Sequence, residues 1–487
     1  MINVSEIKSK GLKGSMWNFL NMMVNQLKTF IVSLILARLL VPADFGLVSM
    51  ALVLNSILDF LVDFGFSSAI IQKERIDNRE LSTVFWLNLL IGGCCSLIAL
   101  CCAPLIAWFY EMPQLRSLIN VTAWSFLISA FGTLQTALFQ RALDFKSPFI
   151  AKLVSGLVSG AIGIVMAFGG YGVWALVYSN IFGWVLNSVI IWIMSPWRPK
   201  FIFKISLVTD MISFGAKMTL STVINRIVKQ MDTLVIGKLY SAASLGLYNR
   251  AQSLNNLVIE YSFSSIRSVM LPSLSMIQKD NEAMKYSVLK LLHIISFLTF
   301  YFSGIMFICA DDILLFLYGD QWVEAVPIFR ILSISSISLC LPVIFDAVLT
   351  AVNRMTMYLW LSVFRNIILL LAIPLGVKYG FMVYVWTVSI ASMLKIFPSM
   401  VTMKMVIQLS LVEQLVTVGR YVLPMGILLV VWYFTNFNTH IYILNIILKS
   451  LLYTILFLTI SFVIRNEGMR IFISLLNGAL KRLRTVF

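Results

Sequence analysis

Charged residues are scarce in this chain. Asp, Glu, Lys and Arg make up 12% of its 487 residues, whereas a soluble domain carries about 25%. The mean hydropathy is +0.93, and apolar stretches of about 20 residues, the length that crosses a bilayer core of about 30 Å, recur along the whole sequence. This composition excludes an ordinary soluble domain and predicts an all-α polytopic membrane protein.

Catalytic and metal-binding motifs are also missing from the sequence. The two histidines are remote from each other, and the six cysteines all lie inside apolar stretches without the spacing of a zinc or redox site. No GxxxxGK[ST] loop is present, which argues against ATP as an energy source. No connection between apolar stretches is long enough for a soluble domain. We therefore predict neither an enzyme nor a protein that holds a metal or an organic cofactor.

The apolar stretches predict about 14 transmembrane helices. Cation-rich connections alternate with connections that contain no Lys or Arg, such as "FGGYG", "ADDILLFLYGDQW" and "TNFNTH". The positive-inside rule places the cation-rich connections and both termini in the cytoplasm. The net charge of +16 thus follows from topology, and nucleic-acid binding is not expected. The expected helix centres lie near Leu27, Asn55, Ser96, Leu127, Gly160, Gly183, Ile224, Leu257, Phe297, Leu339, Leu369, Ser392, Leu428 and Leu452.

A segment of the first half recurs in the second half at an offset of 200 residues. "ILARLLVPADFGL" begins at Ile35 and "VIGKLYSAASLGL" begins at Val235. Six expected spans, an even number, separate the copies, so both halves enter the membrane in the same direction, as in a parallel repeat. The glycines that recur at Gly46 and Gly246 are interpreted as permitting a tight turn into the next helix.

This repeat predicts the domain organisation. Two six-helix lobes are expected at residues 1–196 and 210–405, joined by a basic amphipathic connector at residues 197–209. Residues 406–487 would add two further helices and a basic cytoplasmic tail. We expect residues 21–55 to superpose on residues 221–255.

The repeated region also carries a family resemblance. "LARLLVPADFGLVSMA", "DFGFSSAIIQ", "STVFWLNL" and "DTLVIGKLYSAASLGLYNRA" resemble the signature of Wzx-type polysaccharide transporters. Their superfamily also contains multidrug and toxin extrusion proteins and lipid II flippases. The resemblance implies two lobes that open alternately to the two sides of a bacterial inner membrane. It also implies that the substrate is an oligosaccharide repeat unit on undecaprenyl diphosphate, for capsule, O-antigen or exopolysaccharide synthesis.

The same resemblance implies the setting in which the protein works. Its partners would be membrane lipids and the glycan polymerase and glycosyltransferases of one pathway, and the chain itself is expected to be a monomer. Fourteen spans are typical of the flippases, whereas the drug exporters usually have 12. By analogy with the lipid II flippases, the two extra helices would border a groove for the polyprenyl tail.

Ionisable residues inside apolar stretches are costly and usually face a cavity or a partner. In the first and seventh spans, Asn, Lys and Arg residues recur three or four positions apart, which places them on one helical face. Cations suit an anionic diphosphate, and Asn suits sugar hydroxyls. The candidates for substrate contact are Lys28, Arg226, Lys229, Arg365, Asn21, Asn25 and Asn225.

Asp59 and Asp232 are candidates for coupling transport to an ion gradient. A buried carboxylate binds a proton or a sodium ion, and the membrane potential is an alternative driving force. The opposite interpretation is that each intramembrane cation merely pairs with a carboxylate, as Lys229 and Asp232 would at a spacing of three. Asp63 is interpreted as structural, and His293 as a hydrogen-bonded core residue. Three further cations are expected to snorkel to the interface: Arg38, Lys238 and Lys449.

Three function classes remain open. A flippase for lipid-linked oligosaccharides needs cations around an anionic headgroup, whereas a cation-coupled multidrug exporter needs carboxylates around a cationic drug. A glycan polymerase or ligase would need a large outer loop with catalytic residues, and the longest outer connection is short. The intramembrane cations outnumber the carboxylates and the expected span count is high. Both features favour the flippase.

Reporter fusions test the topology. A fusion after Gly319 is expected to report the outer side and a fusion after Arg75 the cytoplasmic side, because the cation-rich connections face inward. The measurement is the activity of a reporter that works on one side of the membrane only. If both fusions report the same side, the 14-span arrangement is wrong.

Overall fold

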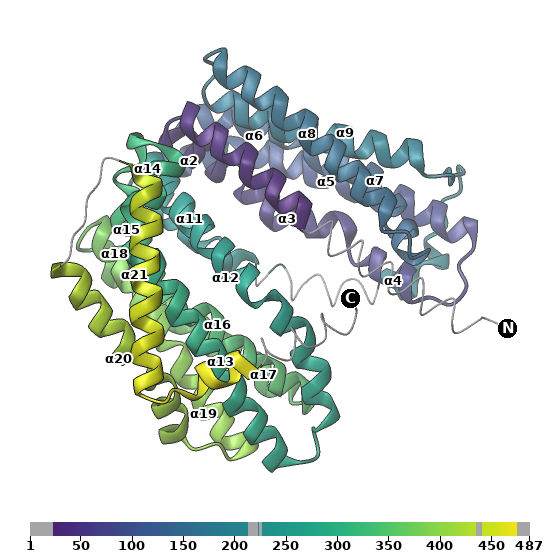
Figure 1. Cartoon of the computed structure of the whole chain (residues 1–487). Coiled ribbons are helices and arrows are strands. Elements are labelled where there is room, and N and C mark those ends of the chain that lie inside the picture. The colour runs from purple at the N-terminus through teal and green to yellow at the C-terminus, as the bar shows by residue number, and fades with distance from the viewer. Residues whose placement is uncertain (1–22, 213–222, 224–225, 435–440, 475–487) are drawn as a thin grey trace, which may run out of the picture. The chain divides into compact units, whose positions relative to one another are not determined.

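The structure is a computed structural model that describes residues 23–212, 223, 226–434 and 441–474. Within these residues every regular element is a helix (Figure 1). Ten described helical segments are long and apolar enough to cross a membrane. They cover ten of the expected centres and confirm an all-α, multi-pass membrane protein.

The other four expected centres have different outcomes. Leu257 lies on α12 (Ala242–Met276) and Leu428 on α20 (Leu411–Phe434). Leu27 lies on a helix that the structure describes from residue 23 to residue 39. Ile224 falls outside the described residues, so the count of 14 stays a prediction.

The chain folds as two compact units, Met1–Gly246 and Leu247–Phe487. The first unit therefore includes the connector and residues 226–246, which the sequence assigned to the second lobe. Its helices are α2 (Pro42–Ala51), α3 (Val53–Asp63), α4 (Phe66–Gln72), α5 (Asn78–Tyr110), α6 (Gln114–Thr122), α7 (Trp124–Arg141), α8 (Lys146–Phe168), α9 (Val173–Met194), the 3₁₀ turn η1 (Ile205–Leu207) and α11 (Met231–Leu239).

One membrane-crossing segment of the first unit is built from three helices in series. The chain from Pro42 to Gln72 is broken between α3 and α4, where Phe64 and Gly65 adopt left-handed backbone angles. Asp63 caps the new helix, since its carboxylate accepts hydrogen bonds from the Ser67 amide at 3.2 Å and the Ser67 hydroxyl at 2.5 Å. This contact agrees with the structural role expected for Asp63.

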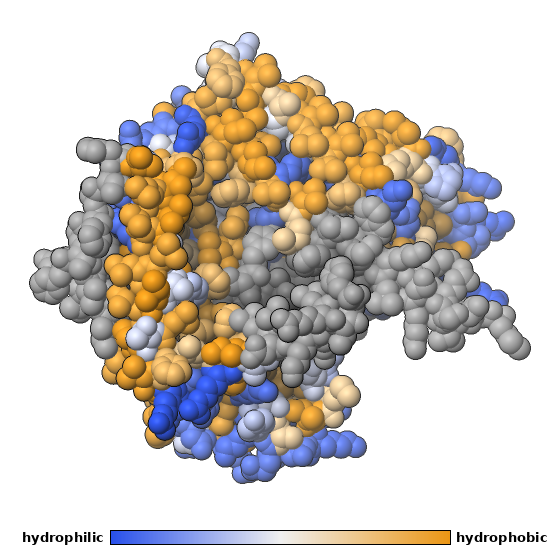
Figure 2. Space-filling view, viewed as in Figure 1, coloured by the Kyte–Doolittle hydropathy of each residue, from blue (hydrophilic) through white to orange (hydrophobic). Residues whose placement is uncertain are grey.

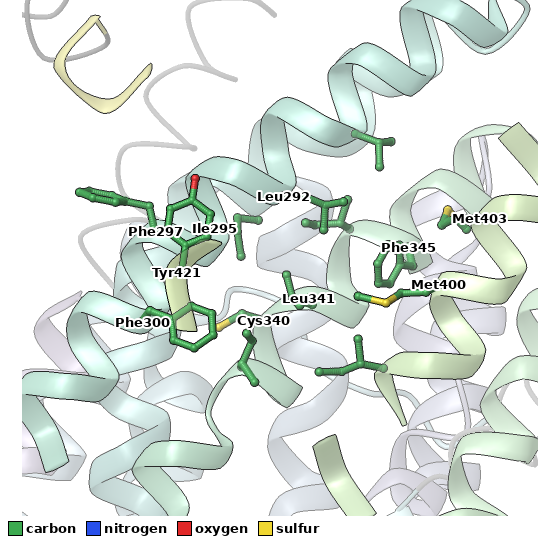
Figure 3. Close-up of a cluster of buried hydrophobic side chains, with 14 of the residues drawn as sticks. Leu292, Ile295, Phe297, Phe300, Cys340, Leu341, Phe345, Met400, Met403 and Tyr421 are labelled. Atoms are coloured by element: carbon green, nitrogen blue, oxygen red, sulfur yellow. The ribbon is translucent and has the colours of Figure 1, made fainter. Parts of the chain in front are cut away.

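The second unit is organised around α13 (Asn281–Ile308). Side chains of α13, α16, α19, α20 and α21 form its core, with Phe297, Phe345, Met400 and Tyr421 among them (Figure 3). The remaining helices are α14 (Ala310–Tyr318), the 3₁₀ turn η2 (Asp320–Trp322), α15 (Ala325–Ser335), α16 (Ile337–Ala351), α17 (Met355–Val377), α18 (Phe381–Leu394), α19 (Ile396–Ile407) and α21 (Tyr442–Val463). A further helix, which the structure describes from residue 467 to residue 474, follows α21.

The repeated glycines lie inside helices and not at a turn. A Cβ atom on Gly46 of α2 would overlap the carbonyl oxygen of Ala242, and one on Gly246 would overlap the carbonyl oxygen of Pro42. The two contacts are equivalent in the repeat, because Gly246 corresponds to Gly46 and Ala242 corresponds to Pro42 at the offset of 200. The turn interpretation is therefore wrong, because these glycines allow two helix backbones to touch, as small residues do in membrane helices.

A second pair of repeated residues makes equivalent contacts in each unit. Asn55 is buried in the first unit and donates from Nδ2 to the carbonyl oxygen of Thr122 at 3.2 Å. Asn255 is buried in the second unit and donates to the carbonyl oxygen of Leu332 at 3.3 Å. Each amide also bonds a serine hydroxyl a few residues further along. These matching bonds support a parallel repeat.

The connector at residues 197–209 packs on the first unit. It is largely extended, and the indole of Trp86 on α5 donates to the Lys200 carbonyl oxygen at 2.9 Å. The Trp86 ring also stacks on Phe201 at 5.2 Å, while the Phe201 side chain is 94% exposed. The connector therefore packs on the N-terminal part of α5.

Substitution of Gly46 by Ala should destabilise the protein. The added methyl group would collide with backbone that cannot rotate away, and overpacking of this kind costs about 1–3 kcal/mol. The measurement is the melting temperature of the purified protein in detergent. Gly419→Ala on α20 is the matched control, because no heavy atom lies near its added Cβ. Equal melting temperatures for the two variants would contradict the close-contact role.

Candidate functional site

The Lys28 ammonium lies between the first described helix and α8. Its Nζ atom donates to the Asn25 side-chain oxygen at 3.0 Å and to the Lys152 carbonyl oxygen at 2.9 Å. Gly156, one turn further along α8, leaves the space for this arrangement, since a Cβ there would collide with Nζ. Neutral oxygens hold this intramembrane cation, so its positive charge is not cancelled by these contacts.

Lys152 is a second cation at this place that the sequence analysis missed. Its side chain is exposed and lies close enough to Lys28 for the two ammonium groups to repel each other. The missed signal was a lysine within the small-residue stretch "AKLVSGLVSG" of α8. Two neighbouring positive charges with hydrogen-bonding Asn25 beside them are suited to binding an anion with more than one phosphate group.

Arg226 lies against α3 in the same unit. Its guanidinium donates to the Ser56 carbonyl oxygen at 2.9 Å and lies 5.8 Å from the centre of the Phe60 ring. It also attracts the carboxylate of Asp59, the residue that directly precedes Phe60 on α3. Asp59 is exposed. The structure therefore brings a substrate candidate and a coupling candidate together.

The remaining candidates of the first unit are more dispersed. Lys229 is exposed, and Asp232 is half-buried in the first turn of α11. Asn21 and Asn225 lie outside the described residues, so the structure describes only part of each polar helical face.

Two of the substrate-like cations inside apolar stretches of the second unit have carboxylate partners. Arg365 donates to Asp346 at 2.9 Å, and Arg330 pairs with Asp311. The Arg365 side chain is only 12% exposed. These contacts match the interpretation in which a cation merely pairs with a carboxylate, which places Arg365 behind Lys28 and Arg226 as a substrate contact.

Lys449 does not snorkel to the interface. Its side chain is 8% exposed and pairs with the buried carboxylate of Asp312 at 2.5 Å, to which Asn445 also donates at 2.9 Å. The snorkelling prediction is wrong here because α14 places a carboxylate beside α21. Breaking a buried pair of this kind costs about 3–5 kcal/mol, so Lys449 is a structural residue.

Lys238 reaches the end of α5 in the first unit. It pairs at 2.7 Å with Glu111, which directly follows this helix. The hydrogen bond and the charge of Lys238 hold the pKa of Glu111 below its ordinary value. The ion pair is therefore intact at neutral pH and is lost only in acid, as the pH falls through that lowered pKa.

The outer surface of the helices is hydrophobic. Figure 2 shows hydrophobic residues along the length of α21 and hydrophilic residues at the end where it runs into residues 467–474. Exposed apolar side chains such as Leu371, Leu375 and Phe462 fit a surface that faces lipid.

Comparison with known protein families shows to which family the chain belongs. The model of the family described as "Polysaccharide biosynthesis protein" matches residues 35–327. The chain belongs to this family. It is 24% identical over 376 residues to the lipopolysaccharide biosynthesis protein WzxC of Escherichia coli, with 76% of each chain covered. It is 23% identical to the succinoglycan biosynthesis transport protein ExoT of Rhizobium meliloti, covering 73% of this chain and 72% of that one.

Solved structures share the fold. The lipid II flippase MurJ in an inward closed conformation matches with a TM-score of 0.69 at 15% identity, over 91% of this chain and 98% of that chain. An inward-facing multidrug resistance transporter of the MATE family matches with a TM-score of 0.63 at 14% identity, over 80% and 98%. The family model and the relatives confirm the Wzx-type resemblance, and these solved structures show a shared fold.

Substitution of Gly156 by Ala tests the placement of Lys28. The added methyl group would displace the ammonium from Asn25 and from the Lys152 carbonyl without changing any charge. A displaced Lys28 would lose its charged hydrogen bond to a bound anion. We expect this loss to weaken anion binding by about tenfold or more. The measurement is surface polysaccharide in a deletion strain that expresses the variant.

The matched control is Gly93→Ala on α5, whose added Cβ would make only ordinary contact with Leu127. Both variants should reach normal membrane levels. Wild-type polysaccharide from Gly156→Ala would show that the position of the Lys28 ammonium is unimportant.

Proposed function

We propose that the protein is a flippase that moves undecaprenyl-diphosphate-linked oligosaccharides across a bacterial inner membrane by alternating access. Family membership supports a role in polysaccharide biosynthesis, and the fold is shared with a lipid II flippase and a multidrug resistance transporter. The Lys28–Lys152 pair carries the substrate assignment. In it, neutral oxygens hold the Lys28 ammonium, and the exposed Lys152 side chain adds a second positive charge.

The energetics favour a substrate role for this pair. A cation near the middle of a membrane costs about 3 kcal/mol on insertion scales, and two neighbouring cations also repel each other. The second unit offsets such costs with carboxylates, as the Arg365–Asp346 and Lys449–Asp312 pairs do. A diphosphate that arrives with the substrate would supply the missing negative charge between Lys28 and Lys152.

The chemistry of this site opposes the drug-exporter alternative. An exporter of cations would need free carboxylates at its binding site, whereas Lys28 and Lys152 would repel a cationic drug. The fold alone does not separate the two functions, since both superfamily branches match it. The positive charge at the Lys28–Lys152 site favours the flippase over the drug exporter.

We further propose that Asp59 and Arg226 link transport to an ion gradient. The exposed carboxylate would take up a proton or a sodium ion and thereby weaken its attraction to the guanidinium. Arg226 would then be released from α3 to contact the diphosphate. Asp232 is the second coupling candidate, and the membrane potential acting on the charged substrate is the alternative driving force.

The proposed setting follows from the substrate. Both termini would face the cytoplasm, where glycosyltransferases assemble the lipid-linked sugar, and the polymerase would take the flipped product on the opposite side. The chain is proposed to work as a monomer among membrane lipids. No further cofactor enters this scheme.

The decisive experiment is complementation of a strain that lacks its flippase. Lys28→Ala and Arg226→Ala should insert normally but lose export, because each lost charge-assisted contact costs about 1.5–3 kcal/mol, or on the order of 10- to 100-fold in affinity. Lys28→Arg should retain more activity than Lys28→Ala. Surface polysaccharide and membrane levels are both measured.

Lys404→Ala is the control, since it removes an exposed cation at the end of α19, in the second unit, that is not among these candidates. Full complementation by the Lys28→Ala, Arg226→Ala double variant would reject the headgroup role. A purely structural role would instead appear as low membrane levels of the variant protein.

A further inference from the structure

A polar cavity of about 310 Å³ opens on the second unit, between α13, α20 and the helix at residues 467–474. It lies apart in sequence from the substrate candidates of the first unit, and nothing in the proposed transport cycle uses it. Its lining combines cations, carboxylates and apolar side chains, including Lys290, His293, Glu413, Arg420, Glu467 and Ile471.

One wall of the cavity is fixed by a buried hydrogen-bond network. His293 bonds the Tyr421 hydroxyl through Nδ1 at 2.9 Å and faces the Glu467 carboxylate through Nε2 at 3.0 Å. The Gly468 amide donates to the same hydroxyl at 3.1 Å. This network, which confirms His293 as a hydrogen-bonded core residue, fastens residues 467–474 to α13 and α20.

The carboxylates of the cavity are engaged, whereas two of its cations are not. Glu467 faces His293, and Glu413 pairs with Lys285 at 4.0 Å and accepts from the Ser410 amide at 3.2 Å. In the part of the chain that the structure describes, Lys290 and Arg420 have no carboxylate within ion-pairing distance. Both are exposed, so the cavity presents two available positive charges.

These two cations lie at the depth of lipid headgroups. Predominantly apolar stretches begin directly after each of them, at Leu291 on α13 and at Tyr421 on α20. α21 ends at Val463, so residues 467–474 also fall just beyond its apolar stretch. Lys279 precedes α13, and Lys404 and Arg420 flank the connection before α20, so the positive-inside rule predicts the cytoplasmic leaflet for this level.

We propose that this cavity binds the phosphate headgroup of an anionic phospholipid from the cytoplasmic leaflet. Lys290 and Arg420 form the charge-assisted contacts to the phosphate, with Arg420 able to donate a forked pair of hydrogen bonds. Leu289 and Ile471 complete the apolar part of the cavity. Val422 and Leu423 of α20, which are 52% and 55% exposed, extend an apolar surface for the acyl chains.

A membrane lipid is favoured over the two other sources of the same phosphate chemistry. A soluble phosphate would gain nothing from the exposed apolar surface beside the cations. The polyprenyl diphosphate of the proposed substrate is scarce in a membrane, whereas phospholipid headgroups surround this level at all times. The lipid site goes beyond the proposed function and does not depend on it.

The test measures lipid binding to the purified full-length protein by native mass spectrometry. The probe is phosphatidylglycerol, with phosphatidylethanolamine as the lipid of zero net charge. Wild-type protein should bind phosphatidylglycerol preferentially, and Lys290→Gln, Arg420→Gln should bind it about 10- to 100-fold more weakly, as expected for lost charged hydrogen bonds. Lys290→Arg should retain binding. The double variant Arg354→Gln, Lys404→Gln removes two exposed cations elsewhere on the predicted cytoplasmic side and should bind like wild type.

Each arm has an outcome that overturns the proposal. Equal binding of phosphatidylglycerol by wild type and Lys290→Gln, Arg420→Gln, at matched melting temperatures, would reject the site. Displacement of the lipid by millimolar inorganic phosphate would assign the cavity to a soluble anion. Preferential binding of undecaprenyl phosphate would assign it to the transport substrate. None of these measurements requires transport, so a failure here is separate from a failure of the flippase proposal.

Discussion

The dominant constraint on this protein is the cost of charge in hydrocarbon. A cation or carboxylate within the membrane needs an opposite charge, a set of hydrogen bonds or access to water. The second unit meets this need internally, with Asp312 and Asn445 around Lys449 and with Asp346 beside Arg365. The first unit leaves Lys28 with neutral acceptors only. The difference separates residues that hold the fold from residues available to a ligand.

The helical architecture was predictable because it depends on local composition. Apolar stretches of sufficient length and alternating cations were enough to anticipate most helices. The offset of 200 aligned Asn55 with Asn255, and the structure shows equivalent buried hydrogen bonds at these two positions. The role of Gly46 and Gly246 was not predictable in the same way. From the sequence alone, a glycine in a turn cannot be distinguished from a glycine at a helix crossing. Only the packing of distant segments distinguishes the two.

The candidate site was partly predictable for a similar reason. The spacing of Asn25 and Lys28 placed them on one helical face, and their hydrogen bond agrees with this placement. Lys152 was missed because its proximity to Lys28 arises from packing between α8 and the first described helix. The prediction that Lys449 snorkels to the interface was wrong because the sequence does not reveal that Asp312 lies beside it.

The reciprocal glycine contact has the form of an isologous interface. Each copy of the repeated segment offers the same patch, a glycine and a carbonyl four residues earlier, to the other copy. Two identical, unlinked half-length chains would satisfy this contact equally well as a symmetric dimer. In such a dimer one substitution would damage both contacts, whereas in the fused chain each contact is altered separately. Fusion of the halves thus frees the two copies to diverge, so that one can carry an uncompensated cation while the other carries neutral pairs.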